Sequence, residues 1–392
     1  MQCDYHDQGL CSSCTLIDQP YAAQLAHKAS VVRDTLGISG GMQWLPPVAS
    51  AEQGFRNKAK MVVAGTVDNP TVGILDPRGR GIDLRACPLY PTAVAQALEV
   101  VAHFSRDMRL LPYNVPKARG ELKHIVLTIS PDGEFMVRFV LRSLRQVDRI
   151  REHLPQLEEQ LPDARVVSVN LQPEHKAVVE GPQEIVLTRQ DTLRMRVNHV
   201  GLYLRPRSFF QTNTDVATAL YHRAAQWADV IAPQRVVDLY CGVGGFALHL
   251  AAPGRTVMGV EISEDAVAAA RRAATELGPV GECVHFRAGD ATVQGGGPRH
   301  VSPGDAPDGE HLFDYDAADL VVVNPPRRGL GVDLARRLDA SAVSSMIYSS
   351  CNATSLARDL AQMPSWKPVE GQVLDMFPHT RHYEVALLLR RR

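Results

Sequence analysis

Cys351 is the residue of this sequence that most directly implies covalent chemistry. It follows Ile347-Tyr348-Ser349-Ser350, which is expected to form the end of a strand. A thiolate is a strong carbon nucleophile even when only a fraction of the thiol is ionised at neutral pH. A single cysteine of this kind is more often a buried core residue, so its role depends on the motifs that precede it.

A glycine-rich turn upstream of this cysteine indicates a nucleotide-like ligand. It reads Asp238-Leu239-Tyr240-Cys241-Gly242-Val243-Gly244-Gly245-Phe246 and follows an apolar run. Glycines let the backbone approach a ligand and open a helix whose amide dipoles face it. The third glycine of a dinucleotide fingerprint is missing. Glu261 ends the next expected strand, where doubly wound folds bind ribose hydroxyls. Asp238, Gly242 and Glu261 therefore favour S-adenosylmethionine over NAD.

The motif Asn324-Pro325-Pro326 follows another apolar run, Leu320–Val323. The two prolines lack backbone donors and stiffen the turn, so the Asn324 side chain is expected to project into a cleft. An amide both donates and accepts hydrogen bonds, which suits a base edge or the methyl donor. Adenine N6 methyltransferases usually carry an aromatic residue next, whereas Arg327-Arg328-Gly329 suits phosphate or RNA backbone.

A thiol behind these two motifs points to methylation of a pyrimidine carbon. C5 of uracil becomes nucleophilic when a thiolate adds to C6, and it can then attack a methyl sulfonium. A general base must afterwards remove the C5 proton, and His379, His382 and Glu384 are the nearby candidates. A methyltransferase acting on adenine or another amine is one rival class, and it would not need the thiol. An iron–sulfur RNA-binding protein without enzymatic activity is the other.

A second group of cysteines lies near the N-terminus. Cys3, Cys11 and Cys14 are followed by Cys87, which precedes a proline. Four thiolates can hold zinc or an iron–sulfur cluster. The uneven spacing differs from the paired Cys-x-x-Cys units of a zinc ribbon, and Cys-Pro is frequent at cluster ligands. A [4Fe–4S] cluster is therefore favoured over zinc, with unligated cysteines as the third alternative.

Composition and charge exclude several classes of protein. With 392 residues, of which 45% are apolar and 22% charged, the chain is expected to form a globular protein of two or three domains. No apolar stretch reaches the roughly 20 residues of a membrane span, and residues 1–30 lack the layout of a signal peptide. A cytoplasmic protein is therefore expected. Because the net charge is −1, any RNA contact must be local, with basic runs at 56–60 and 117–123.

The C-terminal half alternates strands and helices from about residue 208. The expected strands are 236–239, 256–261, 284–288, 320–323 and 346–349, and the expected helices are 245–252 and 264–277. This order predicts an α/β fold, a Rossmann-like, doubly wound and mostly parallel sheet with ligands at the carboxyl ends of its strands. A last strand at 382–389 is expected to close the sheet edge. Residues 294–310 are expected to form a flexible surface insertion.

The N-terminal half has an α+β pattern instead. The expected strands are 60–66, 72–75, 124–130, 134–143, 166–172 and 185–188, and the expected helices are 91–110 and 146–160. We expect three regions. An iron–sulfur-binding region covers 1–90, a central β-rich RNA-binding domain covers 91–205, and the methyltransferase domain covers 206–392.

Together these motifs resemble the RNA uracil-C5 methyltransferase family (the TrmA/RumA/RumB group) over nearly the whole chain. The segments that carry the resemblance are 1–3, 56–60, 87–91, 120–123, 208–213, 238–246, 324–329, 348–352 and 375–384. Within this family, the members that act on 23S rRNA are the most similar. The resemblance implies S-adenosylmethionine-dependent methylation of C5 of a specific 23S rRNA uridine, presented from a loop or flipped out. Another rRNA or tRNA uridine is the alternative substrate.

The resemblance also implies roles for single residues. Cys351 is implied to be the nucleophile, and Glu384 the base that takes the C5 proton. The residues implied to line the S-adenosylmethionine site are Gln211, Tyr240, Glu261 and Asn324. The residues implied to ligate a structural or RNA-positioning [4Fe–4S] cluster are Cys3, Cys11, Cys14 and Cys87. RNA is the expected partner, without DNA or a membrane, and a monomer is expected.

Two features depart from the family pattern. Several relatives begin with an OB-like RNA-binding TRAM domain, whereas this sequence opens on the cysteines. Many relatives carry Asp where Asn324 stands, and Asn resembles the members that act on 23S rRNA. Phe209, Phe210 and Phe377 are candidates for stacking on a base, with core packing expected for at least two of them.

Overall fold

The computed structural model describes residues 1–38, 40–176, 178–292 and 317–392. The expected insertion at 294–310 lies outside the described residues. The chain forms two compact units, each built from separate stretches of sequence. The first unit comprises residues 1–18, 51–196 and 204–214, and the second comprises residues 19–50, 197–203 and 215–392. No helix in these described stretches is long and apolar enough to cross a membrane.

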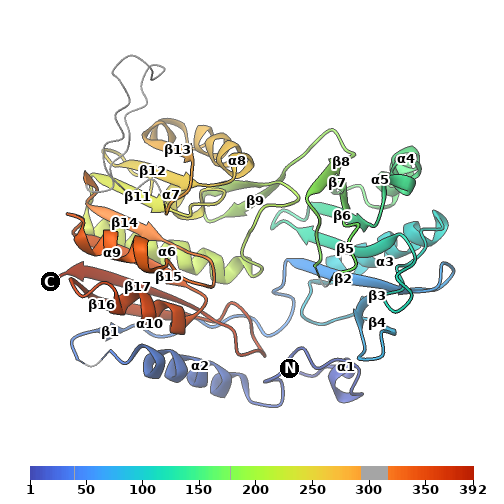
Figure 1. Ribbon diagram of the computed structural model, residues 1–392, viewed down its shortest axis with the longest axis horizontal. Helices are drawn as coiled ribbons and strands as arrows, with labels where there is room; N and C mark the ends of the chain where they lie inside the picture. Colours follow the sequence, from blue (N-terminus) through green and yellow to red (C-terminus); the bar gives the residue numbers. More distant parts are fainter. Residues whose placement is uncertain (39, 177, 293–316) are drawn as a thin grey trace. The chain divides into compact units, whose positions relative to one another are not determined.

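The second unit is built on a sheet whose described strands follow the order β1-β16-β17-β15-β14-β11-β12-β13 (Figure 1). Their bounds are β1 Gln43–Trp44, β11 Arg235–Leu239, β12 Thr256–Glu261, β13 Val284–Ala288, β14 Leu320–Val323, β15 Ser345–Ser350, β16 Trp366–Leu374 and β17 Glu384–Arg391. Neighbouring strands from β15 to β13 are parallel, as predicted, whereas β17 is antiparallel to both of its neighbours. The prediction that the last strand closes the sheet edge is wrong, because β16 and β1 lie beyond it.

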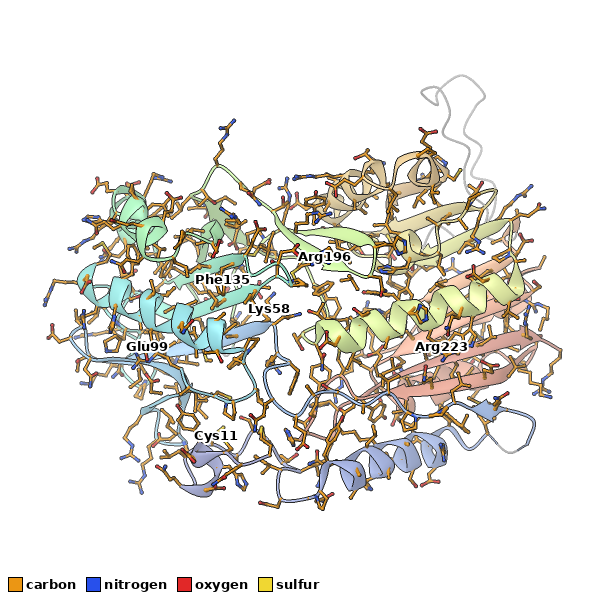
Figure 2. All side chains as sticks on the ribbon, turned by 180° about the vertical axis from the view of Figure 1, so that it is seen from behind. Cys11, Lys58, Glu99, Phe135, Arg196 and Arg223 are labelled. Carbon is orange, nitrogen blue, oxygen red and sulfur yellow. The ribbon has the colours of Figure 1, made fainter. Side chains whose placement is uncertain are left out.

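Helices cover both faces of this sheet. Their bounds are α2 Tyr21–Leu36, α6 Thr214–Ile231, α7 Gly245–His249, α8 Glu264–Thr275, α9 Val332–Ala340 and α10 Ala353–Ala361, with a 3₁₀ turn at Gly278–Cys283. Helices α2, α9 and α10 pack on one face through a shared apolar core. Helix α6 contacts the opposite face, where Arg223 donates from Nε to Gln372 Oε1 at 3.0 Å (Figure 2).

The first unit is built on a sheet with the order β4-β3-β2-β5-β6-β7-β8, antiparallel except between β6 and β7. Its strands are β2 Lys58–Gly65, β3 Pro70–Leu75, β4 Gly81–Asp83, β5 Leu122–Ile129, β6 Phe135–Leu141, β7 Ala164–Leu171 and β8 Gln183–Val186. These strands come from both sides of residue 90. A separate two-stranded sheet joins β9 Leu193–Val197 to β10 Val200–Leu204.

The helices of the first unit are α1 Asp4–Asp7, α3 Thr92–Asp107, α4 Val147–Glu152 and α5 Leu154–Gln160, with a 3₁₀ turn at Leu144–Gln146. Helices α3, α4 and α5 share one apolar core with the sheet. The single helix expected at 146–160 is wrong. The chain breaks at His153, and Pro155 opens α5, since proline suits a first helical turn but not a helix interior.

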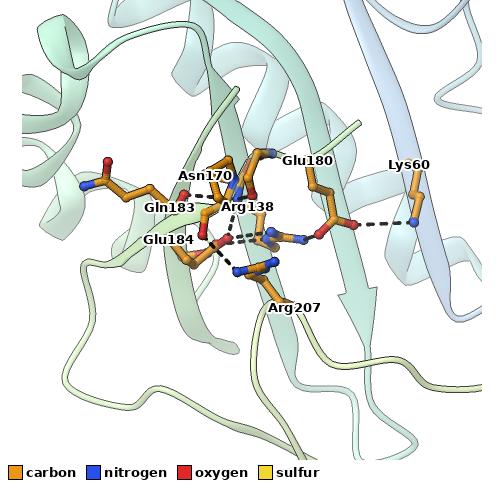
Figure 3. Close-up of polar contacts among 10 residues, drawn as sticks. Lys60, Arg138, Asn170, Glu180, Gln183, Glu184 and Arg207 are labelled. Atoms are coloured by element: carbon orange, nitrogen blue, oxygen red, sulfur yellow. Dashed lines mark hydrogen bonds and ion pairs between the residues drawn. The ribbon is translucent and has the colours of Figure 1, made fainter. Parts of the chain in front are cut away.

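The other face of this sheet carries a buried ionic network centred on Arg138 of β6, which is 1% exposed (Figure 3). Its guanidinium donates to both carboxylate oxygens of Glu184, at 2.9 and 2.5 Å, and to Glu180 at 3.0 Å. Ser168 and Asn170 of β7 also donate to Glu184. A buried arginine is tolerated when it is paired and fully hydrogen-bonded in this way. The network fixes the segment at residues 180–184 to the sheet.

Candidate active site

Three adjacent parallel strands bring the predicted chemistry to one edge of the second unit. Strand β11 pairs with β14 as Leu239 opposite Val323, and β14 pairs with β15 as Val323 opposite Tyr348. The glycine-rich turn, Asn324 and Cys351 follow the carboxyl ends of these strands. Ligand sites of doubly wound folds lie at this edge.

Asp238 and Glu261 accept hydrogen bonds from backbone N–H groups of the glycine-rich turn and of the helix that follows it. Asp238 is fully buried, and its Oδ2 accepts from the backbone N–H of Ala247 at 2.9 Å. Its Oδ1 has no partner among the described residues. Burial, with a further contribution from Glu261, raises the pKa of Asp238 to about 8. Glu261 accepts from the backbone N–H of Gly242 at 3.1 Å, so the carboxylate of β12 holds the turn that follows β11.

Tyr221 of α6 also borders this site, although no motif in the sequence marks it. A Cβ placed on Gly245 would lie 2.5 Å from the Tyr221 hydroxyl oxygen, so glycine is required there by close packing. Burial raises the pKa of Tyr221, and the charges of Asp238 and Glu384 raise it further. The phenol therefore lies within electrostatic range of both the glycine-rich turn and the predicted base. The sequence signal that could have placed Tyr221 is the apolar stripe of α6, in which it lies.

Cys351 and Glu384 are brought together by the antiparallel pairing of β15 with β17. The last recorded pair is Ser350 opposite Val385, and one further step in this register places Cys351 opposite Glu384. Burial raises the pKa of the half-buried Cys351 thiol, the charge of Glu384 raises it further, and Arg327 opposes both. The predicted nucleophile and the carboxylate predicted to be the base thus lie side by side at the strand end.

Glu384 has a buried environment that raises the pKa of its carboxyl group towards neutral pH. Its side chain is 3% exposed, and its Oε1 accepts from the Ser349 hydroxyl at 2.5 Å. Burial raises the pKa of Glu384 to about 7, although the Ser349 hydrogen bond opposes this shift. A base with a pKa near the working pH can both accept and release a proton readily.

The two histidine candidates for the base have other surroundings. His379 is fully buried, and its backbone N–H donates to Gln24 Oε1 at 2.9 Å. His382 is exposed and packs edge-on against Phe377, with ring centroids 5.9 Å apart. Partial desolvation of the ring, and then the charges of Arg327 and Lys28, lower the pKa of His382. The geometry therefore favours Glu384 over either histidine.

The Asn-Pro-Pro loop is held in place by α10. Asp359, which is 1% exposed, accepts from the Tyr348 hydroxyl and from the backbone N–H of Leu330, both at 2.7 Å. A Cβ on Gly329 would lie 2.3 Å from the same carboxylate, and Gly329 has a φ of +87°. Asn324 is half-buried, and its amide makes no hydrogen bond within the described part of the chain. It is therefore available to a ligand.

Gln211 lies in the first unit, where its backbone is firmly held. Asn57 donates from Nδ2 to the Gln211 carbonyl at 3.0 Å, and the Asn57 N–H donates to the Thr212 carbonyl at 2.9 Å. Upstream, Arg207 donates to the Pro182 carbonyl at 2.9 Å, which attaches this segment to the Arg138 network. The place of Gln211 at the methyl-donor site stays a prediction.

The three candidate stacking residues differ in exposure. Phe209 is 75% exposed and Phe210 only 6%, while Phe377 is half-buried. Only Phe209 presents most of its ring to solvent, so it is the one of the three that suits stacking on a base.

The N-terminal cysteines gather in the first unit, on the segment around α1 (Figure 2 labels Cys11) and at Cys87. Burial raises the pKa of Cys14 to about 11, and the charges of Cys87, Cys11 and Cys3 raise it further. The four thiols are thus within electrostatic range of one another. No three His, Cys, Asp or Glu side chains of the described residues are grouped so that they could hold a metal ion.

Comparison with known proteins shows which family this chain belongs to. The family described as tRNA (Uracil-5-)-methyltransferase matches residues 145–392. A relative from Halothiobacillus neapolitanus named 23S rRNA (uracil(747)-C(5))-methyltransferase RlmC is 47% identical over 392 residues, 99% of each chain. A relative of the same name from Shigella sonnei is 45% identical over 390 residues, again 99% of each chain.

Among solved structures, the Pyrococcus abyssi tRNA (uracil-54, C5)-methyltransferase in complex with S-adenosyl-L-homocysteine is similar, with a TM-score of 0.76. The two chains are 26% identical, and the match covers 96% of this chain and 85% of that one. The sheet, the glycine-rich turn and the strand-end residues define an α/β methyltransferase. The chain belongs to the tRNA (uracil-5-)-methyltransferase family. The family and enzyme class that the sequence predicts are confirmed.

Proposed function

We propose that this enzyme methylates C5 of uracil 747 in 23S rRNA, with S-adenosylmethionine as the methyl donor. The relatives of that name align over 99% of the chain at 47% and 45% identity. The observation that carries the chemistry is the register that sets Cys351 opposite Glu384, at the same edge of the sheet as the glycine-rich turn. RNA is the partner, without DNA or a membrane, and the enzyme works as a monomer in the cytoplasm.

The proposed reaction uses Cys351 first. Its thiolate forms a bond to C6 of uracil, and the C5–C6 π electrons move to give a nucleophilic enolate at C5. C5 then takes the methyl group from the sulfonium. Glu384 removes the proton at C5, the C5–C6 double bond re-forms, and the C6–sulfur bond breaks to return the thiolate. Both side chains end the cycle as they began once Glu384 has passed its proton to solvent.

The remaining predicted residues would bind the two substrates. Asp238, Tyr240, Gly242, Glu261 and Asn324 of the second unit would hold S-adenosylmethionine, and the family resemblance assigns Gln211 the same ligand. The exposed guanidinium of Arg327, which lowers the pKa of the Cys351 thiol, suits a phosphate of the target strand. Phe209 would stack on an unpaired base. The first unit, which includes residues 91–196 of the expected RNA-binding domain, would contact the RNA around the target.

Mapping of 5-methyluridine tests the choice of substrate. Deletion of the gene should abolish 5-methyluridine at position 747 of 23S rRNA, the position named for the relatives, and leave tRNA unchanged. A loss in tRNA alone would contradict the rRNA assignment and favour a substrate like that named for the Pyrococcus abyssi enzyme. Re-expression of the Cys351→Ala variant serves as a control, because it should not restore the methylation.

The proposal includes a [4Fe–4S] cluster held by Cys3, Cys11, Cys14 and Cys87. All four are free thiols within electrostatic range of one another. A zinc ion with bonds of about 2.3 Å would need their sulfur atoms almost in contact, whereas each ligand of a cubane binds a different iron and can stand further apart. The uneven sequence spacing of these cysteines and the Cys87-Pro88 pair support a cluster over a single zinc ion. Its role would be to tie the α1 segment to the loop at Cys87.

Iron analysis tests the cluster. Protein purified without oxygen should contain iron and acid-labile sulfide and show the broad visible absorbance of a cluster. Cys87→Ala should lose much of all three, because it leaves one iron of the cubane without its protein ligand, while Cys283→Ser should keep them, since Cys283 lies outside the set. Stoichiometric zinc in the wild-type protein, or an unchanged iron content in Cys87→Ala, would contradict the assignment.

A further inference from the structure

Helix α2 holds the loop that leads to Glu384 by means of two buried polar side chains. Gln24 and Lys28 lie one turn apart on α2 and are 0% and 2% exposed. Side chains of these types are seldom buried unless they are paired. Both are paired with the loop at residues 375–383, which joins β16 to β17.

Lys28 holds the first part of this loop. Its Nζ donates to Asp375 Oδ1 at 2.6 Å and to the Phe377 carbonyl at 3.0 Å. Asp375 is fully buried and directly follows Leu374, which pairs with Glu384 across the hairpin. The ammonium group therefore fixes both a side chain and a backbone carbonyl close to the position where Glu384 enters β17.

Gln24 holds the middle of the loop. Its Oε1 accepts from the His379 N–H at 2.9 Å, and its Nε2 lies 3.3 Å from His379 Nδ1. The same Nε2 donates to the Gln19 carbonyl at 2.9 Å. His379 has a φ of 64°, a left-handed conformation that costs energy for a residue other than glycine. Gln24 thus stabilises a backbone turn that the loop would not readily keep alone.

We propose that Gln24 and Lys28 are positioning residues for the removal of the C5 proton. This inference rests on the function proposed above. A base must lie within hydrogen-bonding reach of the proton that it takes, and a misplacement of about 1 Å can cost about 10²-fold in rate. Apolar side chains of similar volume could fill the same space with comparable stability. The directional contacts of Gln24 and Lys28 therefore serve the geometry of the loop, and through it the placement of Glu384.

Two variants separate positioning from folding. Gln24→Met removes the contacts to His379 and nearly preserves volume, and Lys28→Met with Asp375→Leu removes the ion pair without leaving a buried unpaired charge. With uridine-containing RNA, each should accumulate the covalent enzyme–RNA adduct, and turnover should fall about 10- to 100-fold. Trapping by 5-fluorouridine RNA and the Kd for S-adenosylmethionine should stay within about threefold, because neither requires proton removal.

The matched control is Val32→Ala, which lies on the same helix and is buried in the apolar core. It should lower Tm without accumulating adduct. The inference is wrong if Gln24→Met and the Lys28→Met, Asp375→Leu double variant turn over as the wild type does. It is also wrong if trapping of 5-fluorouridine RNA, release of methylated RNA and Tm all fall together, as a purely structural role requires. If the double variant does not fold, Gln24→Met by itself tests the inference. A wild-type enzyme that is not trapped at all would instead remove the proposed function.

Discussion

Cys351→Ala is expected to abolish the covalent adduct with 5-fluorouridine-substituted RNA and to lower methyl transfer by at least about 10³-fold. In the wild type, fluorine at C5 cannot leave as a proton does, so the complex stops after methyl transfer with sulfur still bound to C6. The adduct is measured as a protein band of reduced mobility that carries both the RNA and the labelled methyl group. Alanine lacks the sulfur atom that joins the protein to the RNA.

Two comparisons make this prediction specific. Cys283→Ser should trap RNA as the wild type does, because Cys283 ends the 3₁₀ turn before β13, away from the β15 strand end. An adenine- or amine-directed methyltransferase would keep its activity in Cys351→Ala, since it needs no thiol. An adduct that persists in Cys351→Ala would place the nucleophile on another residue and would remove the proposed mechanism.

Much of the site could be predicted from the sequence because each motif ends a strand. Parallel strands align their carboxyl ends. The turn after β11, Asn324 and Cys351 are therefore expected at the same edge of the sheet, even when the strand order is unknown. The pairing of β17 with β15 did not follow from the sequence, although the uninterrupted apolar run at 385–389 is typical of a strand buried on both faces. That pairing is what brings Glu384 to Cys351.

Helix α2 was not predicted, and the reason lies in its buried face. The positions that face inward include Gln24, Lys28 and Val32, spaced four residues apart. Two of the three are polar, so the apolar periodicity that signals an amphipathic helix is broken. The periodicity rule fails here because Gln24 and Lys28 bind the loop at 375–383, whereas Val32 packs in the apolar core. Such failures are expected near functional sites.

Glu384→Gln is expected to accumulate the methylated adduct with natural RNA and to lower turnover by about 10²- to 10⁴-fold, the usual contribution of a general base. The glutamine side chain keeps the oxygen that accepts from Ser349 but cannot take the C5 proton. Adduct formation itself should persist and should extend to lower pH, because the charge of Glu384 raises the pKa of the Cys351 thiol. Normal turnover in this variant would place the base elsewhere, with His382 as the next candidate.

The same substitution should change how stability depends on pH. Burial raises the pKa of Glu384 from 4.5 to about 7, so the folded protein binds this proton more tightly than the unfolded chain does. The stabilisation that this proton gives is complete below about pH 4.5 and is lost as the pH rises through 7. At about 1.4 kcal/mol per pKa unit, the loss by pH 8 is about 3 kcal/mol.

The glutamine side chain of the variant carries no charge at any of these pH values, so Glu384→Gln should gain stability relative to the wild type as the pH rises. The difference in Tm between the two proteins should move by several degrees in favour of the variant between pH 5 and pH 8, measured at one salt concentration. Ser349→Ala offers a matched control, because it removes the hydrogen bond but leaves the titrating carboxyl. A Tm difference that is constant across this range would show that the carboxyl titrates at its ordinary pKa. Glu384 would then be ionised at neutral pH, and burial would not raise its pKa.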